Sequence, residues 1–311
     1  MADIPLTGQP PQTRRRWLSE ETMAGYITIS PWIIGFLIFT LIPIVLSIYF
    51  SFTRYNVLTP AHWVGLQNYR QLLTKDPVFV LSIKNTLIYT VMFVPLHVGI
   101  ALAVALLLNE ARHWDGIFRT LFYLPSITPA VATAYLWIWI LNPQVGLVNR
   151  ALSFFHIPAI GWTVDPMWVK PTIVISQLWL MGATIIILLA GLKNVPKELY
   201  EAAKLDGANA WDRFRSVTLP MISGVVFFLA IVDMISALNI FTPGVVMFDQ
   251  NGGPGRAGLF VIMYLFNRAF QYFQMGYASA IAWLLFLVIV AMTIFQFWLS
   301  KRWVYYESGE S

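Results

Sequence analysis

Six long apolar stretches, separated by shorter polar segments, dominate the pattern of hydrophobic and polar positions along the chain. Each runs for about 20–26 residues, the length that an α-helix needs to cross the hydrocarbon core of a bilayer. The pattern therefore predicts six membrane-spanning helices: Ile27–Phe52, Asn85–Leu108, Phe118–Leu141, Pro171–Leu192, Pro220–Phe241 and Gly276–Ser300.

Some features of these stretches need separate treatment. The first follows Arg14-Arg15-Arg16, as in a signal peptide, but it is too long and lacks a small-residue cleavage site, so we expect an uncleaved anchor. Pro95 is expected to kink or interrupt the second span. A seventh stretch, Leu259–Phe273, has only about 15 residues and carries Arg268, which predicts an interfacial or partly re-entrant helix.

Composition independently indicates a membrane protein. Hydrophobic residues make up 58% of the 311 residues and charged residues 11%, against about 25% charged in soluble proteins. The mean hydropathy is +0.67, and a soluble core of this size cannot hide that much apolar surface, so lipid has to cover it. The absence of cysteine excludes disulfides, cysteine-ligated zinc and thiol catalysis.

The 20 Lys and Arg residues predict the orientation, because basic residues beside span ends favour the cytoplasm. With the N-terminus inside, twelve of them fall on the inner side and eight on the outer side. Six spans place both termini in the cytoplasm, whereas a seventh would move Lys301 and Arg302 outward and weaken the bias. The isoelectric point of about 9.4 therefore reflects topology and not nucleic-acid binding.

A polar insert, residues 194–218, separates the fourth and fifth spans. Pro196 suits the first position of a helix, and Glu198 lies in its first turn, where the helix dipole favours anions. Gly207 suits the left-handed residue that ends such a helix. A second short helix is predicted over Asn209–Ser216, so we expect two short helices with a sharp turn at the cytoplasmic face.

The insert has a distinctive spacing: Glu201, Ala202, Ala203, then Gly207 after three residues, then Val217, Leu219 and Pro220 after nine more. This spacing resembles the EAA loop of ABC importer permeases, with Val217 where isoleucine is usual. Farther along, Gly252-Gly-Pro254 and Phe270–Ser279 are similar to the carbohydrate-uptake branch, close to the maltose-type and glycerol-phosphate-type permeases.

The resemblance implies an all-α, six-span fold of the type I ABC importer permeases. Residues 80–300 would form the transmembrane core and residues 27–52 a peripheral helix. Residues 1–26 and 301–311 would be cytoplasmic tails. The 194–218 loop would be the coupling loop that docks on an ATPase subunit.

The resemblance also implies partners and a location, in a bacterial or archaeal inner membrane. Half of a transmembrane pathway would come from this chain and half from a second, homologous permease. Two ATPase subunits would hold ATP and magnesium, so this chain would bind no cofactor and would not be an enzyme. An extracytoplasmic solute-binding protein would deliver a sugar, which crosses by alternating access.

Ionisable residues inside a span indicate functional positions, because an acid at the bilayer centre costs about 2.5–3.5 kcal/mol on insertion scales. Asp233 lies near the middle of the fifth span, and Ser236 and Asn239 follow at three-residue steps. By resemblance, Asp233 falls on a sugar-contacting position. A structural carboxylate paired with another buried group is the alternative, and His97 in the second span is a possible partner.

On the fourth span, Ser176, Gln177 and Trp179 lie near mid-depth. The resemblance places substrate contacts here, although a Ser or Gln inside a span is often only an interhelical hydrogen-bonding residue.

Several sequence motifs are missing from the chain. It has no phosphate-binding G-x-x-x-x-G-K-[ST] loop and no G-x-S-x-G or H-E-x-x-H motif. The histidines His62, His113 and His156 offer no metal-ligand spacing, so neither catalytic nor metal-binding residues are predicted. The energy for transport must then come from other subunits. The alternative, a stand-alone secondary transporter of small polar solutes, would favour two similar halves with broken helices.

Overall fold

The computed structural model describes residues 20–110 and 115–305, and its regular structure is almost entirely helical. Two compact units divide the chain, Met1–Tyr49 and Phe50–Ser311. The first contains one helical run made of α1 (Glu20–Phe36), the π-helical turn η1 (Leu37–Leu41) and the start of α2 (Ile42–Ser51). Its apolar side chains are exposed, as expected for the first predicted span. The basic run Arg14-Arg15-Arg16 lies outside the described residues.

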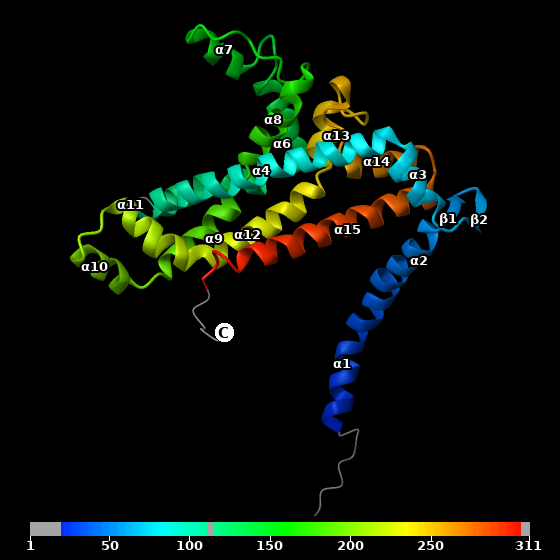
Figure 1. Ribbon diagram of the computed structural model, residues 1–311, viewed down its shortest axis with the longest axis horizontal. Coiled ribbons are helices and arrows are strands. Elements are labelled where there is room, and N and C mark those ends of the chain that lie inside the picture. The colour runs from blue at the N-terminus through cyan, green and yellow to red at the C-terminus, as the bar shows by residue number, and fades with distance from the viewer. Residues whose placement is uncertain (1–19, 111–114, 306–311) are drawn as a thin grey trace, which may run out of the picture. The chain divides into compact units, whose positions relative to one another are not determined.

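The second unit is a bundle of helices (Figure 1). Three predicted spans correspond to the continuous helices α4 (Pro77–Glu110), α12 (Leu219–Leu238) and α15 (Met275–Ser300). Helix α4 runs through Pro95 as one helix, so the expected interruption there is absent. Its packing against α9 and α12 supplies the neighbours that let a membrane helix tolerate proline.

The third and fourth predicted spans are broken helices. The third consists of α5 (Asp115–Tyr123), the 3₁₀ turn η2 (Leu124–Ile127) and α6 (Ala130–Ile140), and it bends by 100°. The fourth consists of α8 (Pro166–Leu178) and α9 (Gly182–Lys193), bent by 56°. Pro125 and Pro129 lack the amide hydrogens that a continuous helix would need, which accounts for the first break.

The two breaks pack against each other at Gly182. A β-carbon there would collide with the backbone of Phe122 and Tyr123, so only glycine permits this close approach. The hydroxyl of Ser126 donates to the carbonyl of Leu180 across the same contact, at 3.3 Å. Proline at one break and glycine beside the other therefore fix the place where α9 meets the third span.

The segments that follow the first, third and fifth predicted spans contain regular structure. They hold β1 (Thr53–Asn56), β2 (Thr59–Trp63), α3 (Gln67–Lys75), α7 (Leu147–Phe154), α13 (Thr242–Phe248), the 3₁₀ turn η4 (Pro254–Arg256), α14 (Val261–Phe266) and the π-helical turn η5 (Asn267–Gln271). Strands β1 and β2 pair antiparallel, with Thr53 opposite Trp63.

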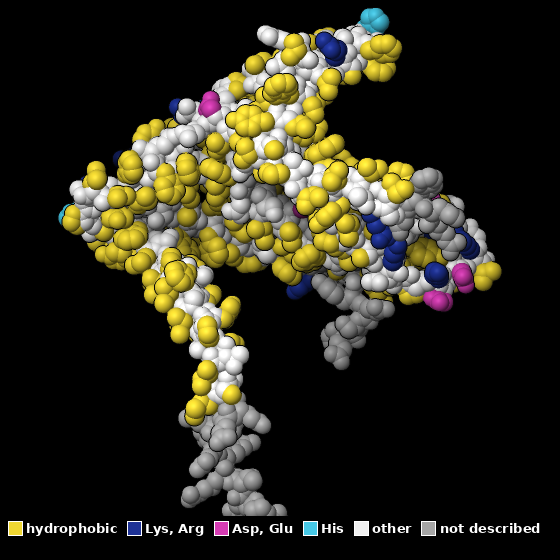
Figure 2. Space-filling model, turned by 180° about the vertical axis from the view of Figure 1, so that it is seen from behind, with side chains coloured by type: hydrophobic (Ala, Val, Ile, Leu, Met, Phe, Trp, Pro, Cys, Tyr) yellow, Lys and Arg dark blue, Asp and Glu magenta, His cyan; other side chains and the backbone are white. Residues whose placement is uncertain are grey.

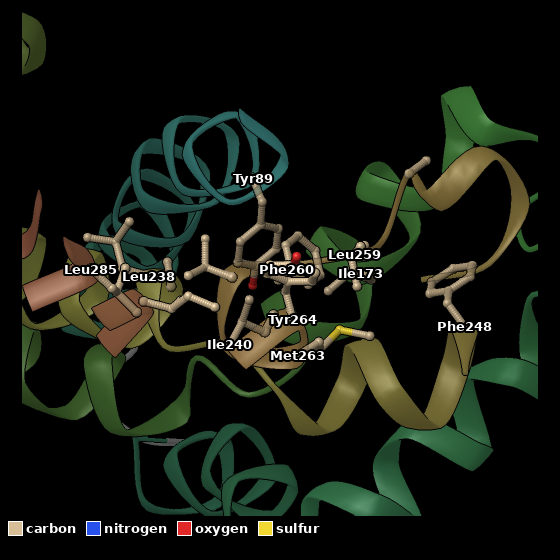
Figure 3. Close-up of a cluster of buried hydrophobic side chains, with 14 of the residues drawn as sticks. Tyr89, Ile173, Leu238, Ile240, Phe248, Leu259, Phe260, Met263, Tyr264 and Leu285 are labelled. Carbon is tan, nitrogen blue, oxygen red and sulfur yellow. The ribbon is translucent and has the colours of Figure 1, made fainter. Parts of the chain in front are cut away.

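The segment Leu259–Phe273, expected to be interfacial or partly re-entrant, is buried or half-buried up to Ala269 and exposed from Phe270 to Phe273. Phe260, Val261 and Met263 are fully buried and belong to the largest apolar cluster, together with side chains from α4, α8, α12 and α15. Figure 3 shows Phe260 and Tyr264 among Tyr89, Ile173 and Leu238. Apolar neighbours in the protein therefore cover the first part of the segment.

The outside of the second unit is strongly apolar. Figure 2 shows one face, where hydrophobic side chains cover most of the helices and Lys and Arg gather at the end that carries α10 and α11. In the described residues, four helices are long and apolar enough to cross a membrane, or six if each bent pair is one span. Six spans agree with the hydrophobic pattern.

Candidate functional site

The polar insert begins with helix α10 (Lys197–Leu205), which ends at a left-handed glycine. Gly207 has a φ of +81°. Its amide donates to the carbonyl of Lys204 at 3.1 Å, and the amide of Ala208 donates to that of Ala203 at 2.9 Å. These two bonds form a Schellman motif, which confirms the predicted stop. Pro196 lies one position earlier than expected, at the N-cap.

The second helix of the insert is not a separate short helix. Asn209 caps it: its side-chain oxygen accepts from the amide of Asp212 at 3.0 Å, and the Asp212 carboxylate accepts from the amide of Asn209 at 3.2 Å. From there α11 (Ala210–Arg213), the π-helical turn η3 (Phe214–Thr218) and α12 form one helix to Leu238. Pro220 cannot donate to the carbonyl four residues earlier, and a π turn accommodates such a defect without breaking the helix.

The turn between α10 and α11 presents apolar side chains to the outside. Leu205 is 89% exposed and Trp211 is 66% exposed, and the rings of Trp211 and Phe214 lie 5.4 Å apart. Glu201 and Ala202 are also exposed, whereas Leu219 and Pro220 are half-buried at the base of α12. Since exposed apolar side chains rimmed by charge are typical of protein contacts, this end of the bundle fits a docking site.

The turn is tied to the rest of the bundle. The hydroxyl groups of Tyr200 on α10 and Thr218 on η3 are hydrogen-bonded at 3.0 Å. A cleft of about 610 Å³ lies beside them, lined by the end of α4, including Glu110, and by Trp211 and Phe214. The turn and the start of α12 therefore form one connected structure.

In the middle of the bundle, Asp233 is paired with His97. The Nδ1 of His97 lies 2.7 Å from the Oδ2 of Asp233, and because a carboxylate only accepts, the imidazole donates. The two side chains are 7% and 11% exposed. The ring of Phe93 stacks on His97 at 4.8 Å. The structure thus joins α4 to α12 through the residue that the sequence singled out.

The other candidates on α12 lie on a different side of the helix. Ser236 and Asn239 are exposed, together with Val232 and Ile235, and the side-chain amide of Asn239 donates to the carbonyl of Ile235 at 2.8 Å. Positions 232, 235, 236 and 239 follow helical spacing, so they form one uncovered face of α12 beside the buried Asp233.

The candidates on the fourth span lie at the end of α8. Ser176 is buried and donates to the carbonyl of Ile173 at 2.7 Å. Gln177 is half-buried, and Trp179 is 50% exposed at the break, with its ring 6.1 Å from that of Trp137. In the described part of the chain, no hydrogen bond joins this group to the candidates on α12.

A third cluster, at the opposite end of α4, was not predicted. The Oδ1 of Asp76 accepts from the amides of Val78 and Phe79 at 3.1 and 3.0 Å. Its Oδ2 accepts from the hydroxyl groups of Tyr264 and Tyr277 and lies 3.6 Å from the Arg268 guanidinium. Asp76-Pro77 is a recognisable helix start, but the sequence gives no signal for its distant tyrosine partners.

The surroundings of Asp76 change its pKa. Burial raises the pKa of this carboxyl, but the hydrogen bonds from Tyr264 and Tyr277, the Phe79 amide and the charge of Arg268 together hold it below its ordinary value of 3.8. Asp76 is therefore charged at neutral pH. Among residues 20–110 and 115–305, no three His, Cys, Asp or Glu side chains come together in a group that could hold a metal ion.

Comparison with known proteins links this geometry to a family. The model of the family described as "Binding-protein-dependent transport system inner membrane component" matches residues 86–305. A similar protein is the probable ABC transporter permease YesP of Bacillus subtilis (strain 168), 42% identical over 305 residues, which are 97% of this chain and 98% of that one. The lactose transport system permease LacF of Rhizobium radiobacter is 31% identical over 284 residues, 89% and 94% of the two chains.

A solved structure shares the fold. The match is a chain in the crystal structure of a bacterial alginate ABC transporter in complex with an alginate pentasaccharide-bound periplasmic protein. Its TM-score is 0.79 at 24% identity, covering 91% of this chain and 96% of the other. The likeness over nearly the whole of both chains identifies the type I importer permease fold.

Proposed function

We propose that this chain, which belongs to the binding-protein-dependent transport system inner membrane component family, is a permease subunit that imports a sugar through a pathway shared with a second, homologous permease. It is a multi-pass membrane protein of the ABC importer class. A relative named for lactose transport and another named for trehalose and maltose support a sugar as the substrate.

The observation that carries this proposal is the turn between α10 and α11. Its Schellman stop, its capped second helix and the exposed Leu205 and Trp211 give a rigid apolar projection at one end of the bundle. We infer that an ATPase subunit receives it there, one for each permease. The basic residues near this end favour the cytoplasm, and we infer that both termini face the same side.

The continuity of α11 with α12 supplies a mechanical route for coupling. Since Ala210 to Leu238 is one helix, a displacement of the turn moves α12 as a unit instead of being absorbed by a loop. Asp233 lies 23 positions after Ala210, roughly 35 Å along the axis. We propose that ATP-driven closure of the ATPases moves α12 and so opens the pathway alternately to each side.

The solute path is proposed along the uncovered face of α12. Ser236 and Asn239 present polar groups on that face, and Trp179 is exposed at the break of the fourth span. These groups suit a polyhydroxylated solute. Hydroxyl and amide groups donate and accept hydrogen bonds, and an indole ring stacks on the face of a sugar. Asp233 would act on the same path if transport movements release it from His97.

The proposal is tested by comparing substitutions of two exposed leucines at opposite ends of the bundle. Leu205 is 89% exposed on the turn between α10 and α11, which we call the coupling turn. Leu58 is 87% exposed between β1 and β2. The affinity-tagged chain, purified from its native membrane, is expected to bring ATPase subunits with it. Leu205→Asp should lose them, and Leu58→Asp should retain them. Retention of the ATPases by Leu205→Asp, or their absence from the wild-type preparation, would contradict the proposal.

A further inference from the structure

A small basic pocket lies at the end of α4 that is farthest from the coupling turn. It has a volume of about 140 Å³ and is lined by Val78, Leu259, Asn251, Asn267, Tyr264 and Tyr272, with Arg256 and Arg268 among its walls. Val78 is in the first turn of α4, whereas Glu110 at its other end lines the cleft beside Trp211. The 34 residues of α4 separate the two ends by about 50 Å.

Arg268 is held rigidly in the wall of this pocket. Its Nε donates to the hydroxyl of Tyr264 at 2.8 Å, and its Nη1 donates to the side chain of Gln274 at 3.1 Å. The guanidinium also lies over the rings of Tyr264, Tyr272 and Tyr277, at 5.0–5.5 Å from their centres. Asp76 balances much of its charge.

Arg256, in contrast, is exposed, and its guanidinium has no partner in the described part of the chain. Its backbone has a φ of +57°, a conformation that residues with side chains rarely adopt and that persists only where the surroundings enforce it. The side-chain amide of Asn85 enforces it by donating to the carbonyls of Arg256 and Leu259, at 2.9 and 3.1 Å. The loop therefore presents an unbalanced positive charge from a fixed backbone.

Two further hollows extend this basic surface. One, of about 250 Å³, is lined by Arg54, Gln71 and Gln274 among others; the other, of about 300 Å³, by Gln67, Arg70, Gln71 and Lys75. Gln71 lines both hollows, and Gln274 links the first to Arg268. No Asp or Glu lines any of the three. The three hollows thus form a row of polar surface in which Asp76 balances Arg268, while no acidic side chain lines the hollows beside Arg54, Arg70, Lys75 and Arg256.

We propose that the pocket between Arg256 and Arg268 receives a carboxylate side chain of the solute-binding protein, and that the adjoining hollows receive further acidic side chains of the same protein. The exposed guanidinium of Arg256 matches a planar carboxylate, which it binds through paired, charge-assisted hydrogen bonds, while Arg268, already bonded to Tyr264 and Gln274, forms the wall behind it. A volume of about 140 Å³ is below the range of roughly 300–1,000 Å³ that is usual for small-molecule sites. A row of separate hollows suits several side chains on one protein face.

This inference rests on the proposed function, since import in a binding-protein-dependent system requires a solute-binding protein at the end opposite the ATPases. The test measures binding of the sugar-free solute-binding protein to the purified transporter complex in nanodiscs, at several salt concentrations. Arg256→Gln should weaken binding by roughly ten-fold or more and reduce its dependence on salt. Arg256→Lys keeps the charge but not the paired geometry, so its affinity for the solute-binding protein should lie between those of the wild type and Arg256→Gln.

Arg150 supplies the matched control. It is an exposed arginine on α7 outside the three hollows, and Arg150→Gln changes the net charge equally, so it should leave binding within about two-fold of wild type. Equal binding by Arg256→Gln and Arg150→Gln would overturn the inference. So would a defect of Arg256→Gln that appears only when sugar is bound, because the carboxylate would then belong to the solute. If the wild-type complex binds no such protein at all, the proposed function fails first.

Discussion

The Nδ1 of His97 on α4 lies 2.7 Å from the Oδ2 of Asp233 on α12, and both side chains are buried. The bond connects two helices whose residues are 136 positions apart. Because α12 continues from the coupling turn, the same bond links α4 to the helix that we expect to move during transport. Removal of one partner leaves the other buried without its hydrogen bond, which is costly inside a bundle.

The first prediction follows from this pair. Asp233→Ala should lower the free energy of unfolding by about 1–3 kcal/mol, the usual cost of leaving a buried hydrogen-bonding group without its partner. Asp233→Asn retains an acceptor for the Nδ1 hydrogen and should cost less. Thermal unfolding of the detergent-solubilised complex, together with uptake measured per folded complex, tests both variants.

The double variant His97→Ala/Asp233→Ala decides between pairing and substrate contact. If the pair is structural, the double variant should be less destabilised than the sum of the two single variants, and residual uptake should keep its sugar selectivity. An additive loss of stability would argue against coupling. A stable Asp233→Ala complex with altered selectivity would instead place the carboxylate at the solute.

The second prediction concerns Gly207. A β-carbon there meets nothing within 4 Å, but the φ of +81° disfavours any other residue by about 1 kcal/mol or more. Gly207→Asp should re-aim α11 and reduce substrate-stimulated ATP hydrolysis while leaving the amount of inserted protein unchanged.

A helical glycine provides the comparison for this variant. Gly99 also has open space around it, without a positive φ, so Gly99→Ala should preserve stimulated hydrolysis and add helix propensity. Wild-type stimulation in Gly207→Asp would mean that the left-handed stop is not required for coupling.

The third prediction concerns Asp76 and pH. Because the folded protein lowers the pKa of this carboxyl below 3.8, the cluster contributes stability fully above that ordinary value and loses it as the pH falls through the lowered one. Asp76→Asn should reduce the melting temperature at pH 7 and at pH 5 alike, since its amide would face the hydroxyl groups of Tyr264 and Tyr277. The difference from wild type should shrink only below about pH 4.

Asp165 offers a control for the acid measurement. It caps α8 by accepting from the amide of Met167 at 2.9 Å, a role that asparagine also fills, so Asp165→Asn should change the melting temperature little at any pH. If the difference in melting temperature between the wild type and Asp76→Asn shrinks well above pH 4, a group other than Asp76 is titrating.

The fourth prediction concerns topology and uses the absence of cysteine, which removes any labelling background. Asn251 and Lys197 are both exposed, at the ends that we assign to the outside and the cytoplasm. In intact cells an impermeant thiol reagent should label Asn251→Cys and leave Lys197→Cys and Ser311→Cys unlabelled until the membrane is opened. Labelling of position 311 in intact cells would favour a seventh span and reverse the assignment of the C-terminus.

The sequence by itself predicted which segments are apolar and long enough to cross a membrane, and where the first helix of the 194–218 insert stops. A span is a property of one continuous segment, because in lipid its backbone has to satisfy its own hydrogen bonds and its side chains have to be apolar. The stop at Gly207 is also local, since it depends on the φ that one residue can adopt. Both predictions therefore agree with the structure without knowledge of any neighbour.

Only the tertiary structure decided how these segments meet. The burial of Phe260, Val261 and Met263, the close approach at Gly182 and the network of Asp76 with Tyr264, Tyr277 and Arg268 depend on residues far apart in the chain. So does the pairing of His97 with Asp233, which sequence could offer only as one of two alternatives. Hydrophobic periodicity indicates that a side chain is buried but carries no record of which helix covers it, and that choice is made by packing.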